Sequence, residues 1–204
     1  MPDPRPSLSR ERAADTRERI LSAARRLVAE GGFRAAQMAA IAAAAGVATG
    51  TPYRHFPSKA DLFVEVLART SRREVEVVAA IASGTGSPAE RLAAGIRAFA
   101  HRAVRGRRLA YALIAEPVDP EVEKARLGYR RQLGQVFEGL LAQGIAAGAF
   151  RDRPVSATAA CLVGALIEGL IGPLAPDAPD ADPEALAEAI VEFCLAAVVR
   201  PPAT

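Results

Sequence analysis

The segment Ile41–Phe63, IAAAAGVATGTPYRHFPSKADLF, decides how the N-terminal part of the chain folds. Apolar residues at helical spacing lead up to Gly46, where glycine supplies the left-handed backbone that a sharp turn between helices needs. We expect a short helix at about 37–44, Val47 to plug the turn, and a very short helix at about 50–53. Two helices joined by such a turn can place the second helix in the major groove of DNA.

The flanking sequence predicts a helix on each side of this pair. Asp15 and Glu18 have the spacing of a capping box and predict the start of the first helix, which Gly31 and Gly32 end. Ser58 is a favourable N-cap for a long fourth helix. The segment 15–60 is therefore expected to form a compact helix-turn-helix domain.

Many residues in this segment have a spacing found in a known family. They are Arg17, Ile20, Leu21, Ala23, Ala24, Gly32, Phe33, Ile41, Ala42, Ala45, Gly46, Val47, Gly50, Thr51, Tyr53, His55, Phe56, Ser58, Lys59 and Leu62. Their order closely resembles the TetR family of transcriptional regulators over about residues 15–63. The resemblance implies a homodimer that binds double-stranded operator DNA and releases it when a small-molecule effector binds. Activation of transcription by the same fold remains an alternative to repression.

The predicted DNA-binding residues follow from this placement and are Gln37, Ala48, Thr49, Gly50, Thr51, Tyr53, His55 and Lys59. The small and hydroxylated residues 49–51 let a helix approach base edges closely. Tyr53, His55 and Lys59 can reach phosphates, and Lys59 lies in the first turn of a helix, where free amides also attract a phosphate oxygen. The resemblance adds Gln37 as a phosphate contact.

Two positions depart from the family pattern. Pro52 stands where the family usually has Leu, and proline is tolerated only near a helix start, which predicts Thr49 as the N-cap of the short helix. Gln37 stands where the family often has Thr or Ser. Phe56 is expected in the core of the small domain.

Charge is unevenly distributed along the chain. Residues 1–60 hold ten Lys or Arg against five Asp or Glu, whereas the remainder holds 16 basic and 18 acidic residues. The basic part is the expected polyanion-binding part. Residues 1–14 are predicted to form a flexible basic arm, whose Arg5, Arg10 and Arg12 either follow the minor groove or form a solvated tail.

The remainder, residues 61–204, predicts a helical ligand-binding and dimerisation domain. Helices are expected at about 88–104, 106–115, 119–147, 155–171 and 183–199, separated by segments rich in Gly, Pro and Asp. No segment shows the sustained alternation of a strand. The whole chain is therefore predicted to be all-α, with about nine helices.

The last two predicted helices, about 155–171 and 183–199, are apolar around much of their circumference. The residues concerned are Leu162, Leu166, Ile167, Leu170, Leu186, Ile190, Phe193 and Leu195. Pairing these helices with those of a second copy would bury the apolar surface that one chain's core does not need. Gly164 and Gly169 would permit close approach between the helices. Ordinary core packing within one chain is the alternative.

A ligand site is predicted from aromatic and isolated polar residues at helical spacing: Phe99, Tyr111, Glu116, Tyr129, Leu133, Phe137 and Glu168. Core packing is the alternative for each of them singly. Glu116 and Glu168 are candidate charge partners. Glu168 lies on an exposed stripe, pairs across the dimer, or faces a cationic ligand.

Other classes of protein find little support. The motifs of common enzymes are absent, and no cofactor or metal is expected. Cys161 and Cys194 lie in apolar helical runs, which leaves a thiol redox sensor as a weak alternative. The start of the chain lacks a signal peptide, and the apolar run 157–175 is interrupted by Glu168 and Pro173, so a cytoplasmic protein without membrane contact is expected.

Overall fold

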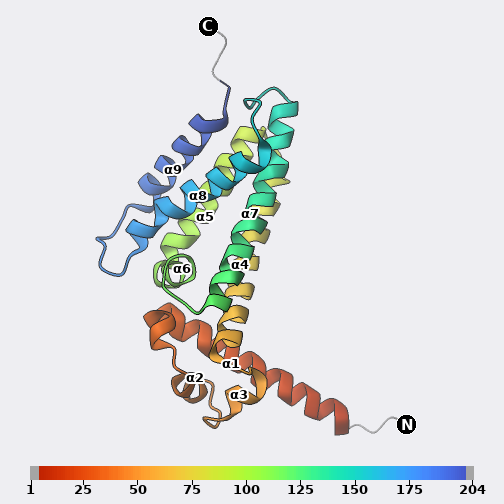
Figure 1. Ribbon diagram of the computed structural model, residues 1–204, viewed down its shortest axis with the longest axis vertical. Helices are drawn as coiled ribbons and strands as arrows, with labels where there is room; N and C mark the ends of the chain where they lie inside the picture. The colour runs from red at the N-terminus through yellow and green to blue at the C-terminus, as the bar shows by residue number, and fades with distance from the viewer. Residues whose placement is uncertain (1–4, 201–204) are drawn as a thin grey trace.

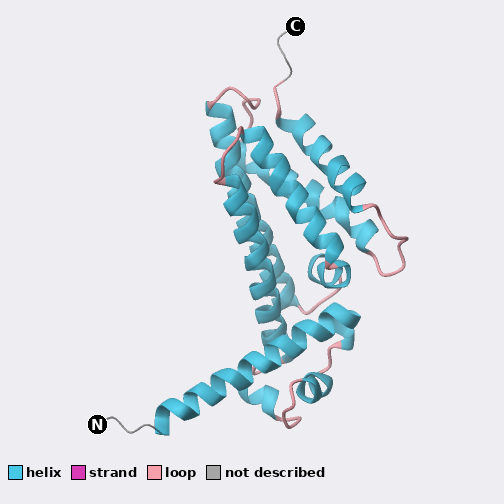
Figure 2. Cartoon of the chain, turned by 180° about the vertical axis from the view of Figure 1, so that it is seen from behind, coloured by secondary structure: helices cyan, strands magenta, loops and turns pink. Residues whose placement is uncertain are grey.

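The computed structural model describes residues 5–200, with side chains from Arg10 onward, and contains helices and loops (Figures 1 and 2). The helices are α1 (Arg5–Ala35), α2 (Met38–Ala44), α3 (Thr51–His55), α4 (Lys59–Ala82), α5 (Pro88–Arg105), α6 (Arg107–Ile114), α7 (Pro120–Ala146), α8 (Val155–Leu174) and α9 (Pro183–Val198). Within residues 5–200 there are nine helices and no strand, which confirms the predicted all-α fold.

The first helix begins earlier than predicted. It starts at Arg5, so Asp15 lies inside it and residues 5–14, expected as part of a flexible arm, are helical. The segment after Pro6 contains no helix breaker, and the Thr16 hydroxyl donates to the Arg12 carbonyl oxygen at 2.8 Å in the regular helical pattern. The arm's predicted contact with the minor groove stays a prediction, and residues 1–4 lie outside the described residues.

The helices α1, α2 and α3, together with the start of α4, form a head at the bottom of Figures 1 and 2. The core of this head contains Ile20, Leu21, Ala24, Val28, Phe33, Met38, Ile41, Phe56, Leu62, Phe63, Val66 and Leu67. The rings of Phe33 and Phe63 meet edge to face, with their centroids 4.8 Å apart. Phe56 is buried, as predicted.

The helices α5, α7, α8 and α9, with the rest of α4, form the body. The long helices α4 and α7 lie side by side along most of its length, and α8 packs on α7 while α9 packs on α5 (Figure 1). A second core fills the space between them, with Ile96, Leu133, Phe137, Leu140, Leu141, Leu166, Leu170 and Val191 among its members.

The head and the body are joined by shared packing rather than by a linker. Leu109, Ala112 and Leu113 of α6 belong to the head core, although α6 follows α5 of the body in the chain. The helix α4 belongs to both, since its residues up to Leu67 pack in the head core and Val78 packs in the body core. A domain boundary at residue 60 stays a prediction, but the packing crosses it.

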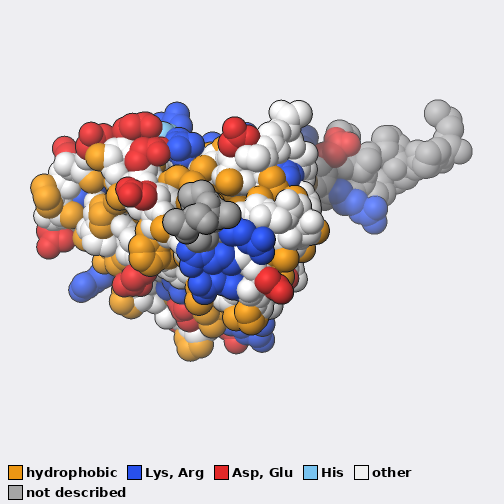
Figure 3. All heavy atoms as spheres, turned by 90° about the horizontal axis from the view of Figure 1, so that it is seen from above, with side chains coloured by type: hydrophobic (Ala, Val, Ile, Leu, Met, Phe, Trp, Pro, Cys, Tyr) orange, Lys and Arg blue, Asp and Glu red, His pale blue; other side chains and the backbone are white. Residues whose placement is uncertain are grey.

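The end of the body opposite the head is closed by a short backbone pairing. Phe150 and Val199 form an antiparallel bridge, and the Phe150 ring fills the space that a Cβ on Gly144 would need. The Arg151 amide donates to Val198 and the Arg200 amide to Ala149. Figure 3, which views the molecule from above, shows a group of Lys or Arg side chains gathered on this end.

Candidate nucleic-acid interface and ligand cavity

The turn between α2 and α3 has the geometry that the sequence predicts. Gly46 has a φ of +66°, and Val47 packs on the head core. Arg19 of α1 donates from Nη2 to the carbonyl oxygens of Ala45, at 2.6 Å, and of Gly46, at 3.1 Å. These bonds satisfy carbonyl groups that the end of α2 leaves free, and they fix the turn against α1.

The recognition helix α3 starts one residue later than predicted. Its N-cap is Gly50 rather than Thr49, no side chain caps it, and Pro52 lies in its first turn as expected. The Thr51 amide donates to the Ala48 carbonyl oxygen at 2.8 Å, so a tight turn performs the role that Thr49 was expected to fill. The Thr49 hydroxyl is therefore not committed to capping.

The predicted DNA-contacting residues between positions 48 and 55 are accessible to different degrees. Residues 48–50 are exposed, and Thr51 and His55 are half-buried. Tyr53 is 54% exposed although it is a large aromatic residue. Arg54, beside it, is also exposed and was not singled out from the sequence. A basic residue next to a predicted phosphate contact on the same helix is the signal that could have identified it.

Gln37 and Lys59, which are predicted to bind phosphate, lie together. The Lys59 ammonium donates to Gln37 Oε1 at 3.2 Å and lies 5.3 Å from the centre of the Phe63 ring. Gln37 is the N-cap residue of α2, but its side chain donates to the Arg34 carbonyl oxygen at 2.7 Å instead of capping the helix. Ser58 caps α4 as predicted, accepting from the Asp61 amide at 3.0 Å.

Arg17 holds the recognition helix against its neighbours. Its guanidinium lies 4.7 Å from the centre of the Phe56 ring and donates to both oxygens of Glu65 on α4, with Nη1 at 2.7 Å from Oε1. This bond holds the pKa of Glu65 below its usual value, with a smaller contribution from Arg69. Because α3 has only a little over one turn of its own, such contacts determine its orientation.

A buried contact at Gly32 ties the head to the body. The helix α1 is interrupted at Gly32, which has a φ of +76°. The Phe33 amide donates to Glu116 Oε2 at 2.8 Å, and Arg108 Nη2 donates to the Gly31 carbonyl oxygen at 2.8 Å. The Arg108 and Glu116 side chains are themselves paired at 3.7 Å. We call Gly31–Phe33, Arg108 and Glu116 the junction clamp.

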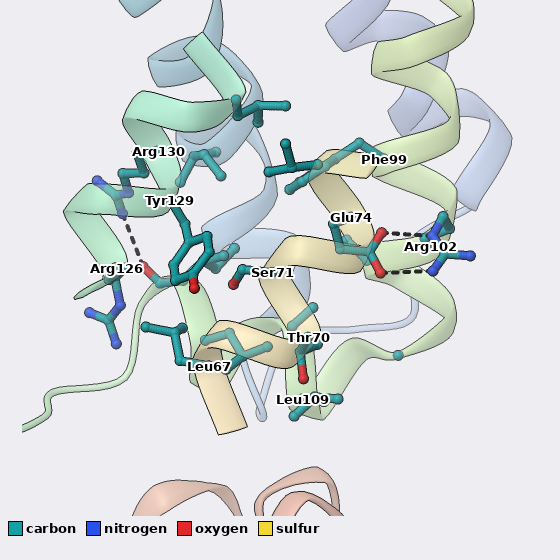
Figure 4. A pocket seen from close by; sticks show the side chains of 18 of the residues that line it. Leu67, Thr70, Ser71, Glu74, Phe99, Arg102, Leu109, Arg126, Tyr129 and Arg130 are labelled. Carbon is teal, nitrogen blue, oxygen red and sulfur yellow. Dashed lines mark hydrogen bonds and ion pairs between the residues drawn. The ribbon is translucent and has the colours of Figure 1, made fainter. Parts of the chain in front are cut away.

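The body contains a cavity of about 350 Å³ between α4, α5, α6, α7 and α8. Its volume is within the range of small-molecule sites, roughly 300–1,000 Å³. The lining residues are Arg25, Leu67, Thr70, Ser71, Glu74, Val75, Phe99, Arg102, Ala103, Arg105, Gly106, Leu109, Ala110, Leu113, Ile114, Arg126, Tyr129, Arg130, Leu133 and Ile167. Figure 4 shows the Tyr129 ring and the Ser71 hydroxyl among the side chains that line it.

The predicted ligand-site residues divide into two groups. Phe99, Tyr129 and Leu133 line the cavity. Tyr111 packs against the body core outside the cavity, and Phe137 is almost fully buried in that core. The core-packing alternative therefore describes the placement of these last two residues.

The two predicted charge partners are elsewhere. Glu116 belongs to the junction clamp, where its carboxylate accepts a hydrogen bond from the Phe33 amide. Glu168 is exposed on α8, although its neighbour Ile167 lines the cavity. One helical residue corresponds to a rotation of about 100°, which is enough to move a side chain from the inner to the outer face. The polar residues that do line the cavity, Arg126 and Arg130 among them, were missed because arginines on a long helix usually face solvent.

The helices α8 and α9 leave an outer face of small and apolar residues uncovered. Residues of this face are Ala157, Ala160, Cys161, Gly164, Glu168 and Gly172 on α8 and Ala185, Ala189, Glu192, Phe193, Ala196 and Ala197 on α9. Most of the large apolar residues that were predicted to exceed the needs of one chain's core, such as Leu166 and Leu170, are buried within the chain. Phe193, in contrast, is 66% exposed. Gly169 packs against Ile190 of α9, and Gly164 stays open on the outer face.

By length and composition alone, α8 could cross a membrane, and only 33% of its most apolar window is buried in the single chain. The same test is passed by core helices of soluble proteins, so it is weak evidence. The exposed part of α8 coincides with the small-residue face shared with α9.

The two cysteines differ in environment. Cys194 is buried, which raises the pKa of its thiol to about 11, whereas Cys161 is exposed on α8. Neither forms a disulfide. Among residues 5–200, no group of three or more His, Cys, Asp or Glu side chains is placed to hold a metal ion.

The fold and the head define a helix-turn-helix DNA-binding protein with a helical ligand domain. The sequence profile of bacterial regulatory proteins of the tetR family matches residues 20–66, and that of the tetracyclin repressor-like C-terminal domain matches residues 85–169. The chain belongs to the TetR family of transcriptional regulators, which are not enzymes.

Curated relatives match over part of the chain. The HTH-type transcriptional repressor KstR of Mycolicibacterium smegmatis is 41% identical over 85 residues, which are 42% of this chain and 42% of that protein. The chain thus spans about two fifths of the length of this relative.

Solved structures match over most of the chain. The regulator FadR of Bacillus subtilis, in complex with stearoyl-CoA, has a TM-score of 0.77 at 22% identity, covering 88% of this chain and 98% of its own. A regulator from Saccharomonospora viridis, in complex with choline, has a TM-score of 0.77 at 21% identity, covering 92% and 100%. At such identities these likenesses show the shared fold.

Proposed function

We propose that the protein is a ligand-responsive transcriptional repressor that binds a palindromic operator as a homodimer. The proposal rests chiefly on the accessibility of residues 48–51 and 53–55 and on the contact between Gln37 and Lys59. The similarity of part of the chain to KstR, which is named a repressor, favours repression over activation. Operator DNA lies in the cytoplasm of a bacterium, so the proposal places the protein there.

The DNA contacts are assigned by chemistry. Thr49, Gly50 and Thr51 approach base edges, where the small side chains permit close contact and the hydroxyls donate or accept. Tyr53, His55 and the pair of Gln37 and Lys59 hold phosphates and set the position of α3 in the groove. The exposed Arg54 is added as a further phosphate contact.

The homodimer is assigned to the outer face of α8 and α9. An exposed Phe193 among alanines and glycines is unfavourable in water and suits helix packing against a second copy. A two-fold dimer also places two recognition helices about 34 Å apart, as successive major grooves require. Helix α8 then becomes an interface helix, in agreement with its incomplete burial in one chain.

The effector is assigned to the cavity, because two proteins of the same fold have been solved with small molecules of different size and charge. Leu67 of α4 both lines this cavity and packs in the head core. Arg126, another lining residue, donates to the Glu116 carbonyl oxygen at 2.8 Å, and the Glu116 carboxylate holds the Phe33 amide. A ligand that shifts α4 or Arg126 changes the separation of the two heads and lowers operator affinity by its preference for that state.

The first experiment is selection of binding sites from fragmented genomic DNA, followed by fluorescence anisotropy titration of the best site at two salt concentrations. The wild type is expected to select a short palindrome. Lys59→Gln should weaken binding to all sequences similarly, and it should lower the slope of log affinity against log salt by about one for each phosphate that the side chain neutralises.

The chain offers a matched control, because Lys124 is its only other lysine and lies exposed on α7, outside the predicted DNA-binding residues. Lys124→Gln should leave both affinity and salt slope unchanged. No enrichment of any sequence over random DNA would contradict specific operator binding. Equal effects of the two substitutions would contradict the assignment of Lys59.

A further inference from the structure

The charged residues that line the cavity are mostly basic. Arginines line it at positions 25, 102, 105, 126 and 130, whereas Glu74 is its one lining carboxylate within the described residues. Glu74 is already bound by Arg102, through bonds of 2.6 and 2.8 Å. Figure 4 shows this pair on the opposite side of the view from Arg126 and Arg130. The positive charge of the Arg126 and Arg130 wall is thus not balanced by the cavity's own carboxylate.

Arg126 is an unusually buried cation. Its side chain is 8% exposed. Nη1 pairs with Glu123, and Nη2 donates to the carbonyl oxygens of Ala112 and Glu116, but Nε is buried without a protein acceptor. Burial lowers the pKa of the guanidinium, and the charge of Arg130 acts in the same direction. A buried donor without an acceptor costs stability, so the guanidinium of Arg126 is incompletely satisfied by the protein.

Arg130 lies one helical turn further along the same face of α7. Its Nη2 donates to the Ile114 carbonyl oxygen at 3.1 Å, and its Nε, like that of Arg126, is buried without a protein acceptor. Across residues 5–200, no carboxylate is placed to pair with it. Two neighbouring guanidinium groups repel each other, and an anion close to both relieves that repulsion.

The rest of the cavity wall is mainly apolar, with Leu67, Phe99, Leu109, Leu133 and Ile167 among its residues. We propose that the cavity binds an amphipathic anion, whose apolar body packs against these residues and whose carboxylate or phosphate group accepts from Arg126 and Arg130. This assignment rests on the proposed function of the cavity as the effector site, and it differs from the alternative that Glu168 faces a cationic ligand.

The test compares ligands that share a ten-carbon chain and differ in the head group. Binding of decanoate, decyl phosphate, decanol and decyltrimethylammonium to the full-length protein is measured by isothermal titration calorimetry. Decanoate or decyl phosphate should bind at least about tenfold more tightly than decanol, because charge-assisted bonds to arginine are strong, and the cation should bind least. The order of the two anions shows which head group the site prefers.

A variant locates the head group. Arg130→Gln should weaken binding of the preferred anion by about tenfold or more while leaving decanol nearly unchanged. Arg131→Gln is the matched control, because Arg131 is the next residue on α7, is exposed and does not line the cavity. The melting temperature of each variant is checked first, and the comparison of head groups on the wild type does not depend on either variant.

The outcomes separate this proposal from the proposed function. If the cation binds as tightly as the anions, if no anion binds, or if Arg130→Gln and Arg131→Gln have equal effects, the anion site is overturned, whereas operator binding measured in parallel is unaffected. If an anion binds with the expected dependence on Arg130 but no operator is selected, the anion site is supported and the regulator is contradicted.

Discussion

Gly32 carries two constraints at a single residue. Its φ of +76° disfavours any side chain, and a Cβ there would collide with the Glu116 carboxylate. Because Gly32 also has a ψ of −179°, a backbone region that is essentially restricted to glycine, we expect Gly32→Ala to lower the free energy of unfolding by about 1–3 kcal/mol through backbone strain. Displacing the carboxylate from the Phe33 amide should cost about 1–3 kcal/mol more. Urea unfolding followed by circular dichroism measures the sum.

Gly148 provides the control for this prediction. Its φ is +70°, but no atom lies within 4 Å of the position of an added Cβ. Gly148→Ala should therefore show the cost of a positive φ without a steric contact. Equal losses for the two substitutions would mean that the contact with Glu116 adds nothing to stability.

The cysteines allow a second prediction for single residues. Because burial raises the pKa of Cys194 to about 11, its thiol stays protonated and unreactive at pH 7 and still mostly so at pH 9. In the native protein, titration with a disulfide reagent should detect at most Cys161, and unfolding in urea should release the second thiol. Two thiols reacting rapidly in each native chain would contradict this and favour the redox-sensor alternative.

At the scale of elements, the short connection after α6 links head and body through Glu116. Its side chain is only 14% exposed. Glu116→Ala removes the acceptor of the Phe33 amide and should cost about 1–3 kcal/mol of stability, whereas Glu116→Gln keeps a carbonyl oxygen and should cost less. Glu116→Ala should also reduce the change in operator affinity that a bound effector causes. If both quantities match the wild type, the junction clamp does not couple the two parts.

Helix boundaries could be predicted where one residue imposes the local backbone. Gly46 fixes the turn after α2, Ser58 caps α4, and Pro88 and Pro183 each stand at the first position of a helix. The start of α1 could not be predicted in this way, because a good capping residue such as Asp15 does not prevent a helix from continuing through it. Local preference shows where a helix can begin rather than where it must.

The cavity could be predicted only in part, since it depends on packing between helices. Aromatic residues at helical spacing identified Phe99 and Tyr129, but the same spacing also occurs in the core, where Phe137 lies. Which face of α7 turns toward α4 is set by contacts far apart in the sequence. The burial of Arg126 depends on those contacts and has no signature in its neighbouring residues.

At the scale of the whole molecule, the proposed dimer is formed through the outer face of α8 and α9. Phe193→Glu should convert the proposed dimer to a monomer, because it places a charge near Glu168 and Glu192 on a face that packing would bury. Light scattering during size-exclusion chromatography measures the mass. Operator affinity should fall strongly, since one head reads only half of a palindrome.

Leu127 is the control for the dimer, because it is a large hydrophobic residue that is 48% exposed on α7, away from the outer face of α8 and α9. Leu127→Glu should leave the mass and the operator affinity unchanged. A monomeric wild type, or a Phe193→Glu protein that remains dimeric, would place the dimer interface elsewhere or remove it.

The sharing of one core between α1, α4 and α6 limits how regulators of this type can be recombined. A chimera joined at residue 60 would give this head a foreign α6, which lacks Leu109 and Leu113 in the head core and Glu116 at the turn of Gly32. Such a graft would recognise the intended operator but respond poorly to its effector. Transplanting α6 and the following turn together with the head would preserve the connection, so the exchangeable unit is discontinuous in the sequence.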